Sequence, residues 1–149
     1  MSAFVERAYV VTLTIPDNEA FTALTTLARL GLPVETAVRS DIWVATVEAG
    51  AAAAVDLEVA TIETIYNPNK HRLEVREDAG PRPGEVWITA RDETPAITVA
   101  GRTVAGLRGI VRRTGWRLLD EGGGDVPPDV LAAATEQFLC NPAFQKALR

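Results

Sequence analysis

The chain has 149 residues, of which 47% are hydrophobic and 23% are charged, and its formal net charge is -5. This composition is typical of a globular protein with a buried core, and the acidic balance argues against nucleic acid as a partner. A single cysteine excludes an internal disulfide, and a single histidine excludes a multi-histidine metal site.

The sequence also bears on the compartment. The first residues, Met1 to Arg7, lack an apolar run of signal-peptide length. No segment approaches the roughly 18 apolar residues that a membrane span needs. We therefore expect a cytoplasmic protein without a membrane partner.

The first predicted elements are a strand and a helix. Residues 9–15 are rich in β-branched side chains, which favour a strand. Asp17 or Asn18 can cap a helix over residues 18–30, in which apolar residues recur at helical spacing. Gly31 is placed to end that helix.

The next elements are a hairpin, a second helix and a strand. Residues 34–47 alternate between the two faces of a strand and predict a hairpin that turns at Ser40-Asp41. From Ala51 the pattern becomes helical, and Asn67-Pro68 should break that helix because proline disfavours the helical conformation at the residue before it. Residues 70–76 alternate again as a half-buried strand. The apolar residues of the second helix are Val55, Val59, Ile62 and Tyr66.

Residues 1–76 therefore have the predicted order β-α-β-β-α-β, which is the ferredoxin-like arrangement.

Residues 77–84 are rich in proline and glycine and predict a linker. Residues 85–149 form a second, less complete module. Its predicted elements are a strand at 86–90, a helix at 102–113, a short strand at 116–119, a glycine turn at 122–124, a helix from Pro127 to Asn141-Pro142, and a strand or helical tail at 144–149. The expected fold class is α+β, with two antiparallel sheets that each carry helices on one face.

The two halves share a short segment of similar sequence. Thr61 to Pro68 and Thr135 to Pro142 both run from threonine through two apolar residues to Asn-Pro, 74 positions apart. Two interpretations stay open: an internal repeat, or two unrelated helices that end with the same stop signal.

Few residues suggest chemistry. Gly101, Arg102 and Thr103 precede the predicted helix, where backbone N–H groups and the guanidinium could hold an anion; a solvated helix start is the simpler interpretation. His71 and Cys140 are expected to be core or interface residues, since neither has an assigned catalytic partner. No catalytic group, cofactor or metal is expected. The candidate interface or anion contacts are Gly101, Arg102, Thr103, Asn67, Asn141 and Trp43.

Several motifs resemble those of the PurS family, the small subunit of phosphoribosylformylglycinamidine synthase in purine biosynthesis. Both Ile65-Tyr66-Asn67-Pro68 and Phe138-Leu139-Cys140-Asn141-Pro142 look like the end of that family's second helix. The run from Pro95 to Val104, with Gly101-Arg102-Thr103, and the Gly115-Trp116 pair are similar to its first helix. The chain is nearly twice as long as a usual member, and each half departs from part of the pattern.

The resemblance implies a non-catalytic subunit that bridges a glutaminase and an ATP-dependent synthetase in a ligase complex. It also implies pairing of two modules, within one chain or in a homo-oligomer. The alternative is an ACT-like regulatory protein that binds a small ligand on the same fold. An independent enzyme is the third possibility, although the sequence contains no visible catalytic pair.

Overall fold

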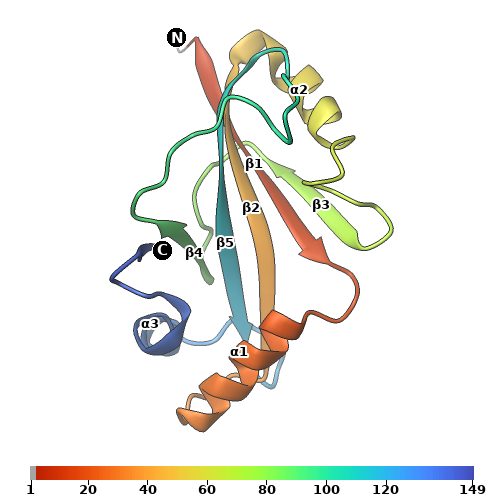
Figure 1. The fold of residues 1–149 in the computed structure, drawn as a ribbon. Helices are drawn as coiled ribbons and strands as arrows, with labels where there is room; N and C mark the ends of the chain where they lie inside the picture. Colours follow the sequence, from red (N-terminus) through yellow and green to blue (C-terminus); the bar gives the residue numbers. More distant parts are fainter. Residues whose placement is uncertain (1–2) are drawn as a thin grey trace. The chain divides into compact units, whose positions relative to one another are not determined.

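The structure is a computed structural model that describes residues 3–149. These residues form an α+β fold with three α-helices and one open antiparallel sheet of six strands, in the order β3-β1-β2-β5-β4-β6 (Figure 1). No helix in this part of the chain is both long and apolar enough to cross a membrane. The elements are β1 (Phe4–Leu13), α1 (Asn18–Arg29), β2 (Thr36–Glu48), the 3₁₀ turn η1 (Ala49–Ala51), α2 (Ala52–Val59), β3 (His71–Arg76), β4 (Glu85–Ala90), β5 (Leu107–Leu119), α3 (Pro128–Ala134), the π-helical turn η2 (Thr135–Leu139) and β6 (Gln145–Leu148).

The chain divides into two compact units, and each unit takes segments from both halves of the sequence. The first unit comprises Met1–Ile15, Asp41–Ala79 and Glu93–Arg113, and the second comprises Pro16–Ser40, Gly80–Asp92 and Thr114–Arg149. The units therefore do not coincide with the modules 1–76 and 85–149 that the sequence suggests. Residues 77–84 do form an irregular connection, which joins β3 to β4.

The core of the first unit lies between α2 and the strands. Side chains of β1 and β2 that alternate toward one face, such as Tyr9 and Val47, pack against Val55 and Val59 of α2. The irregular segment 93–106 completes this core. Its buried residues in this cluster are Val99 and Val104, which are 4% and 2% exposed.

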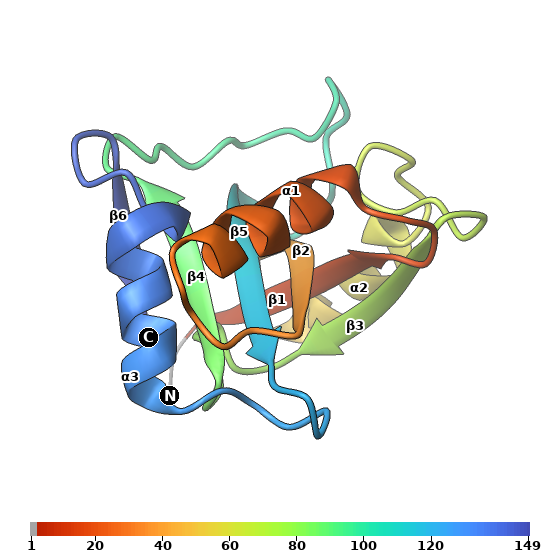
Figure 2. The ribbon, with the colours of Figure 1, turned by 90° about the horizontal axis from the view of Figure 1, so that it is seen from below.

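The second unit has a separate core in which two helices cover β4 and β5. Ala20, Ala23 and Leu27 of α1 lie three to four residues apart and are buried in the same cluster as Leu131 of α3. Trp116 of β5 belongs to this cluster too. Figure 2 shows α1 and α3 beside β4 and β5.

The first predicted helix is confirmed together with its cap. The Asp17 side chain accepts hydrogen bonds from the backbone N–H groups of Glu19 and Ala20, at 3.0 and 3.2 Å. These bonds satisfy donors that the first helical turn cannot pair internally. Gly31 adopts a positive φ of 80° just after the C-cap, as expected for a helix-ending glycine.

The predicted hairpin at 34–47 is wrong, because β2 continues through Ser40-Asp41 as one strand of 13 residues. Neither residue has the positive φ that a tight hairpin turn needs. The first 76 residues therefore have the order β-α-β-α-β and supply three strands, so the ferredoxin-like order is not found. The second helix is also shorter than predicted, since α2 ends at Val59.

The predicted helix at 102–113 is wrong as well. Residues 107–119 form β5, which also absorbs the short strand expected at 116–119. Arg108 and Arg112 are four residues apart, and this even spacing puts them on one face of a strand as well as on one face of a helix. The two periodicities could not be separated from these residues.

Parts of the sheet are covered on both faces. Ala8, Tyr9, Val10 and Val11 are consecutive and all buried, although adjacent side chains of a strand point in opposite directions. The same holds for residues 86–89 of β4. These stretches are therefore buried on both faces of the sheet.

Candidate functional site

The Asn67-Pro68 segment forms a turn that ends at the first residue of β3. The Asn67 carbonyl accepts from the N–H groups of Lys70 and His71, at 3.0 and 2.8 Å. The Asn67 side chain accepts from the N–H of Asn69 at 2.9 Å. The Asn67 N–H donates to Nδ1 of His71 at 2.9 Å, so the imidazole closes the turn.

The Asn141-Pro142 segment forms a turn with the same four bonds, ahead of β6. The Asn141 carbonyl accepts from the N–H groups of Phe144 and Gln145, at 3.1 and 2.8 Å. The Asn141 side chain accepts from the N–H of Ala143 at 3.1 Å. The Asn141 N–H donates to Oε1 of Gln145 at 2.9 Å. Asn67 and Asn141 therefore have the same structural role, in different units.

The surroundings of the His71 ring favour its neutral form. Its Nδ1 accepts a hydrogen bond from a backbone N–H, so that nitrogen must be unprotonated in the closed turn. Burial lowers the pKa of His71 below the usual 6.5, and the positive charge of Lys70 lowers it further, whereas Asp41 acts in the opposite direction. The Tyr66 ring lies 6.5 Å away, centroid to centroid.

The candidate residues 101–103 do not lie at a helix. Val99 and Arg102 exchange two backbone hydrogen bonds of 2.9 and 2.8 Å, and the two residues between them, Ala100 and Gly101, both have positive φ. This is the geometry of a two-residue hairpin turn. Because no helix follows at Thr103, the helix N-terminus that would have held an anion is absent there. The Arg102 guanidinium instead lies 3.2 Å from the Glu58 carboxylate.

Trp43 is half-buried on β2 and packs against the core of the first unit. The Arg112 guanidinium lies 5.5 Å from the centre of its ring and 3.0 Å from the Asp41 carboxylate, which holds the cation over the ring. The indole Nε1 is buried and makes no hydrogen bond within the described residues. Trp43 therefore lies at the boundary of this core.

A partly buried polar network in the first unit could not be identified from the sequence. The Tyr9 hydroxyl donates to Asp56 at 2.6 Å, and Arg7 approaches the other oxygen of that carboxylate at 3.4 Å. Burial raises the pKa of Tyr9, and the bond to Asp56 raises it further. Tyr9 therefore stays protonated and ties β1 to α2. Since Tyr9 and Asp56 are 47 positions apart, no local spacing connects them.

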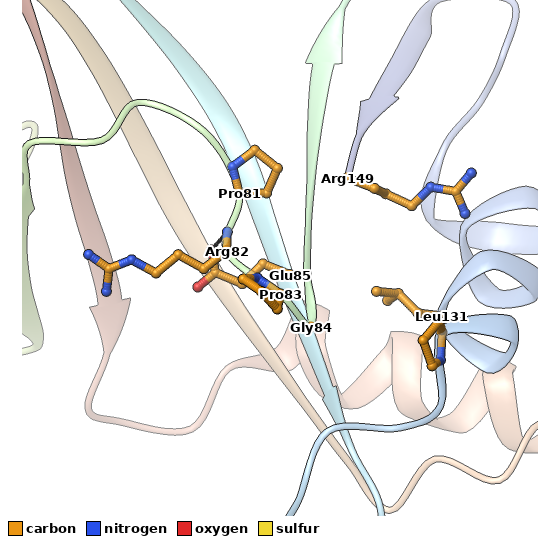
Figure 3. Close-up of a pocket in the computed structure, with 8 residues that line it drawn as sticks. Pro81, Arg82, Pro83, Gly84, Glu85, Leu131 and Arg149 are labelled. Atoms are coloured by element: carbon orange, nitrogen blue, oxygen red, sulfur yellow. Dashed lines mark hydrogen bonds between the residues drawn. The ribbon is translucent and has the colours of Figure 1, made fainter.

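The second unit contains a cavity of about 520 Å³ (Figure 3). Leu131 of α3 points into it, whereas the guanidinium groups of Arg82 and Arg149 extend away from its centre. The cavity is thus apolar in character and is not an arginine clamp for an anion. Its lining residues are Pro81, Arg82, Pro83, Gly84, Glu85, Pro128, Leu131 and Arg149.

A second cavity in the same unit, of about 480 Å³, has an acidic wall formed by Glu35, Asp120 and Glu121. Asp120 is already used by its own turn, because its carboxylate accepts from the N–H groups of Gly122 and Gly124 at 2.9 and 3.2 Å. Among residues 3–149 no three His, Cys, Asp or Glu side chains lie close enough to hold a metal ion.

The candidate residues thus occupy separate local environments: a hairpin turn, a strand and two matching turns. The sequence matches no protein-family model and no curated protein.

Proposed function

We propose that this chain is a non-catalytic subunit that resembles PurS and bridges a glutaminase and an ATP-dependent synthetase in phosphoribosylformylglycinamidine synthase. The observation that carries the proposal is the repeated Asn-Pro turn, at the same segments on which the sequence resemblance depends. A bridging protein needs surfaces for two partners, and a chain built from two related halves supplies a related surface in each.

The strands that follow the two turns support a common origin of the halves. Thr14 donates to the Lys70 carbonyl at 2.9 Å, and Arg91 donates to the Phe144 carbonyl at 2.8 Å. Beyond these bonds the two antiparallel strand pairs have the same register. Leu13 lies opposite His71, and Ala90 lies opposite Gln145. The shared strand register favours an internal repeat over two unrelated helix ends with the same stop signal.

The strand order supports the same conclusion. The first half of the sequence supplies β3-β1-β2, and the second half supplies β5-β4-β6, so the order is mirrored about the middle of the sheet. The segments between the first two strands of each half are exchanged. Helix α1 belongs to the second unit, and residues 93–106 belong to the first. This arrangement supports the proposal that the chain consists of two paired modules joined by residues 77–84.

The proposal assigns the protein to the cytoplasm and gives it no chemistry of its own. Its role is to fix the geometry of two enzymes, so that ammonia released by the glutaminase reaches the synthetase. The cation-capped Trp43 and the Arg102–Glu58 pair then belong to surfaces of the first unit, and Asn141 to the second.

Reconstitution with a purified glutaminase and synthetase tests this function. The chain is expected to bind both enzymes and to be required when glutamine is the nitrogen donor, but not when free ammonia is supplied. The ammonia reaction is the control, because it needs the synthetase alone. Failure to bind either enzyme, with an unchanged glutamine-dependent rate, would remove the proposal.

The apolar cavity of the second unit favours a second candidate, an ACT-like protein that binds a small ligand. Proline rings and Leu131 would accept an apolar side chain or a flat ring, rather than a free phosphate. Calorimetry with amino acids and nucleotides separates the two functions. Saturable binding of one compound by the chain alone favours the ligand-binding function, and no heat with any of them removes it.

A further inference from the structure

The two matching turns differ in the side chain that closes them. In the first turn the acceptor for the asparagine N–H is Nδ1 of His71, and in the second it is Oε1 of Gln145. Both bonds are 2.9 Å long, and both acceptors belong to the first residue of an outer strand of the sheet. An amide oxygen accepts at any pH, whereas a protonated imidazole has no acceptor.

We propose that the Asn67–His71 turn is an acid-sensitive latch on the start of β3, and that the Asn141–Gln145 turn is its insensitive counterpart. Protonation of the imidazole puts a second donor opposite the Asn67 N–H, so the closing bond is lost and two donors face each other. The inference does not depend on the proposed function.

The groups around His71 determine how the stability of the turn changes with pH. The charged groups that act on the ring are Lys70, which precedes it, and Asp41 of β2, while Tyr66 packs beside it. Burial and Lys70 both disfavour the charged ring, so the pKa of His71 is lower in the folded chain than in the unfolded one. The stabilisation by the neutral ring is therefore fully present above about pH 6.5 and is lost as the pH falls through the folded pKa.

Protonation of His71 should at first disrupt only the structure near the turn. The hydrogen bonds of the turn show which backbone amides are affected. The Lys70 carbonyl accepts from Thr14, and His71 is the first residue of β3 to pair with β1, at Leu13. Opening of the turn thus exposes the amides of Asn67 and Thr14. The corresponding amides of the second turn are Asn141 and Arg91, and they form the control within the same molecule.

Amide hydrogen exchange of the full chain, measured by NMR across pH 7 to pH 5 and corrected for intrinsic exchange rates, tests the latch. The protection factor of Asn67 is expected to fall by up to about tenfold per pH unit between about pH 6.5 and the lower folded pKa of His71 and then to level off, while that of Asn141 stays constant. Equal behaviour of the two amides would overturn the proposal.

Two reciprocal variants complete the test, since each turn already contains the side chain that the other lacks. His71→Gln should keep Asn67 protected at both pH values, and Gln145→His should make the protection of Asn141 fall in acid. If His71→Gln retains the acid response of Asn67, the latch is refuted. If Asn67 loses its protection in this variant even at pH 7, an amide cannot replace the ring, and the proposed equivalence of the turns is wrong.

Discussion

At the scale of single residues, two glycines have the same backbone conformation but different surroundings. Gly101 and Gly106 have φ of 76° and 87°, in the left-handed region that other residues enter only at a cost. A Cβ at Gly101 would meet nothing within 4 Å, whereas a Cβ at Gly106 would lie 2.5 Å from that of Ala51. Substitution of these two glycines therefore distinguishes the cost of backbone strain from the cost of a close contact.

Gly106→Ala should therefore destabilise the protein more than Gly101→Ala. We expect a loss of about 1 kcal/mol for Gly101→Ala from the left-handed conformation alone. For Gly106→Ala we expect about 3 kcal/mol, because η1 must also move away. Urea unfolding curves measure both losses. Equal values would show that the contact with Ala51 relaxes at no cost.

A second prediction at this scale concerns the Tyr9 hydroxyl. Tyr9→Phe should cost about 1–2 kcal/mol, since Asp56 loses a buried donor. Tyr66→Phe is the matched control, because the Tyr66 hydroxyl makes no hydrogen bond to residues 3–149. Denaturant titration at neutral pH provides the comparison.

The same residue predicts a response to alkali. Because the pKa of Tyr9 is raised in the folded chain, its contribution to stability is present below the ordinary tyrosine pKa of about 10 and declines as the pH rises above it. The stability of the Tyr9→Phe variant should decline less over that range. A decline of the same size in both proteins would assign the effect to other groups.

At the scale of elements, the cap of α1 has two functions that one substitution can separate. Asp17 accepts from the first turn of the helix, and its carboxylate also lies 3.1 Å from Nε of Arg39 on β2. Asp17→Asn keeps a good cap but loses the charge, and Asp17→Ala loses both. We expect losses of about 0.5 and 2 kcal/mol in the free energy of unfolding. If the two variants unfold at the same denaturant concentration, the ion pair and not the cap is the dominant interaction.

Three element boundaries with a local signal were predictable from the sequence, whereas α2 ends at Val59, before its predicted stop at Asn67-Pro68. The cap at Asp17, the stop at Gly31 and the proline start of the last helix at Pro128 are all found. The last segment, for which the sequence predicts either a strand or a helical tail, forms the strand β6. The two long strands were missed because Ser40-Asp41 at the centre of β2 was interpreted as a turn and because the arginine spacing in β5 fits both periods.

The candidate site was predictable only where a local motif shapes it. Asn67 and Asn141 were singled out by the Asn-Pro pair, and both form the turn that such a pair favours. The role of Arg102 depended on a helix that is absent, and its actual partner, Glu58, lies in a distant part of the sequence. The Tyr9–Asp56 bond shows the same limit, because contacts between remote residues arise only from the packing of whole elements.

At the scale of the whole molecule, the exchanged segments predict how the chain behaves when it is divided into two fragments. Each unit contains residues from both sides of the 77–84 connection. Fragments 1–79 and 80–149 should therefore be unfolded separately and should regain the fold as a one-to-one complex when mixed. Circular dichroism and size-exclusion chromatography measure this. Cooperative unfolding of either fragment by itself would show that the exchange is dispensable.

The two long strands carry a further consequence. β2 passes from the second unit into the first between Ser40 and Asp41, and β5 passes the other way between Arg113 and Thr114, both without a break in the strand. Because each of these strands has residues in both units, we expect the two units to unfold together. Heating should produce a single endotherm whose calorimetric and van't Hoff enthalpies agree. Damage to one core would then lower the melting temperature of the entire chain.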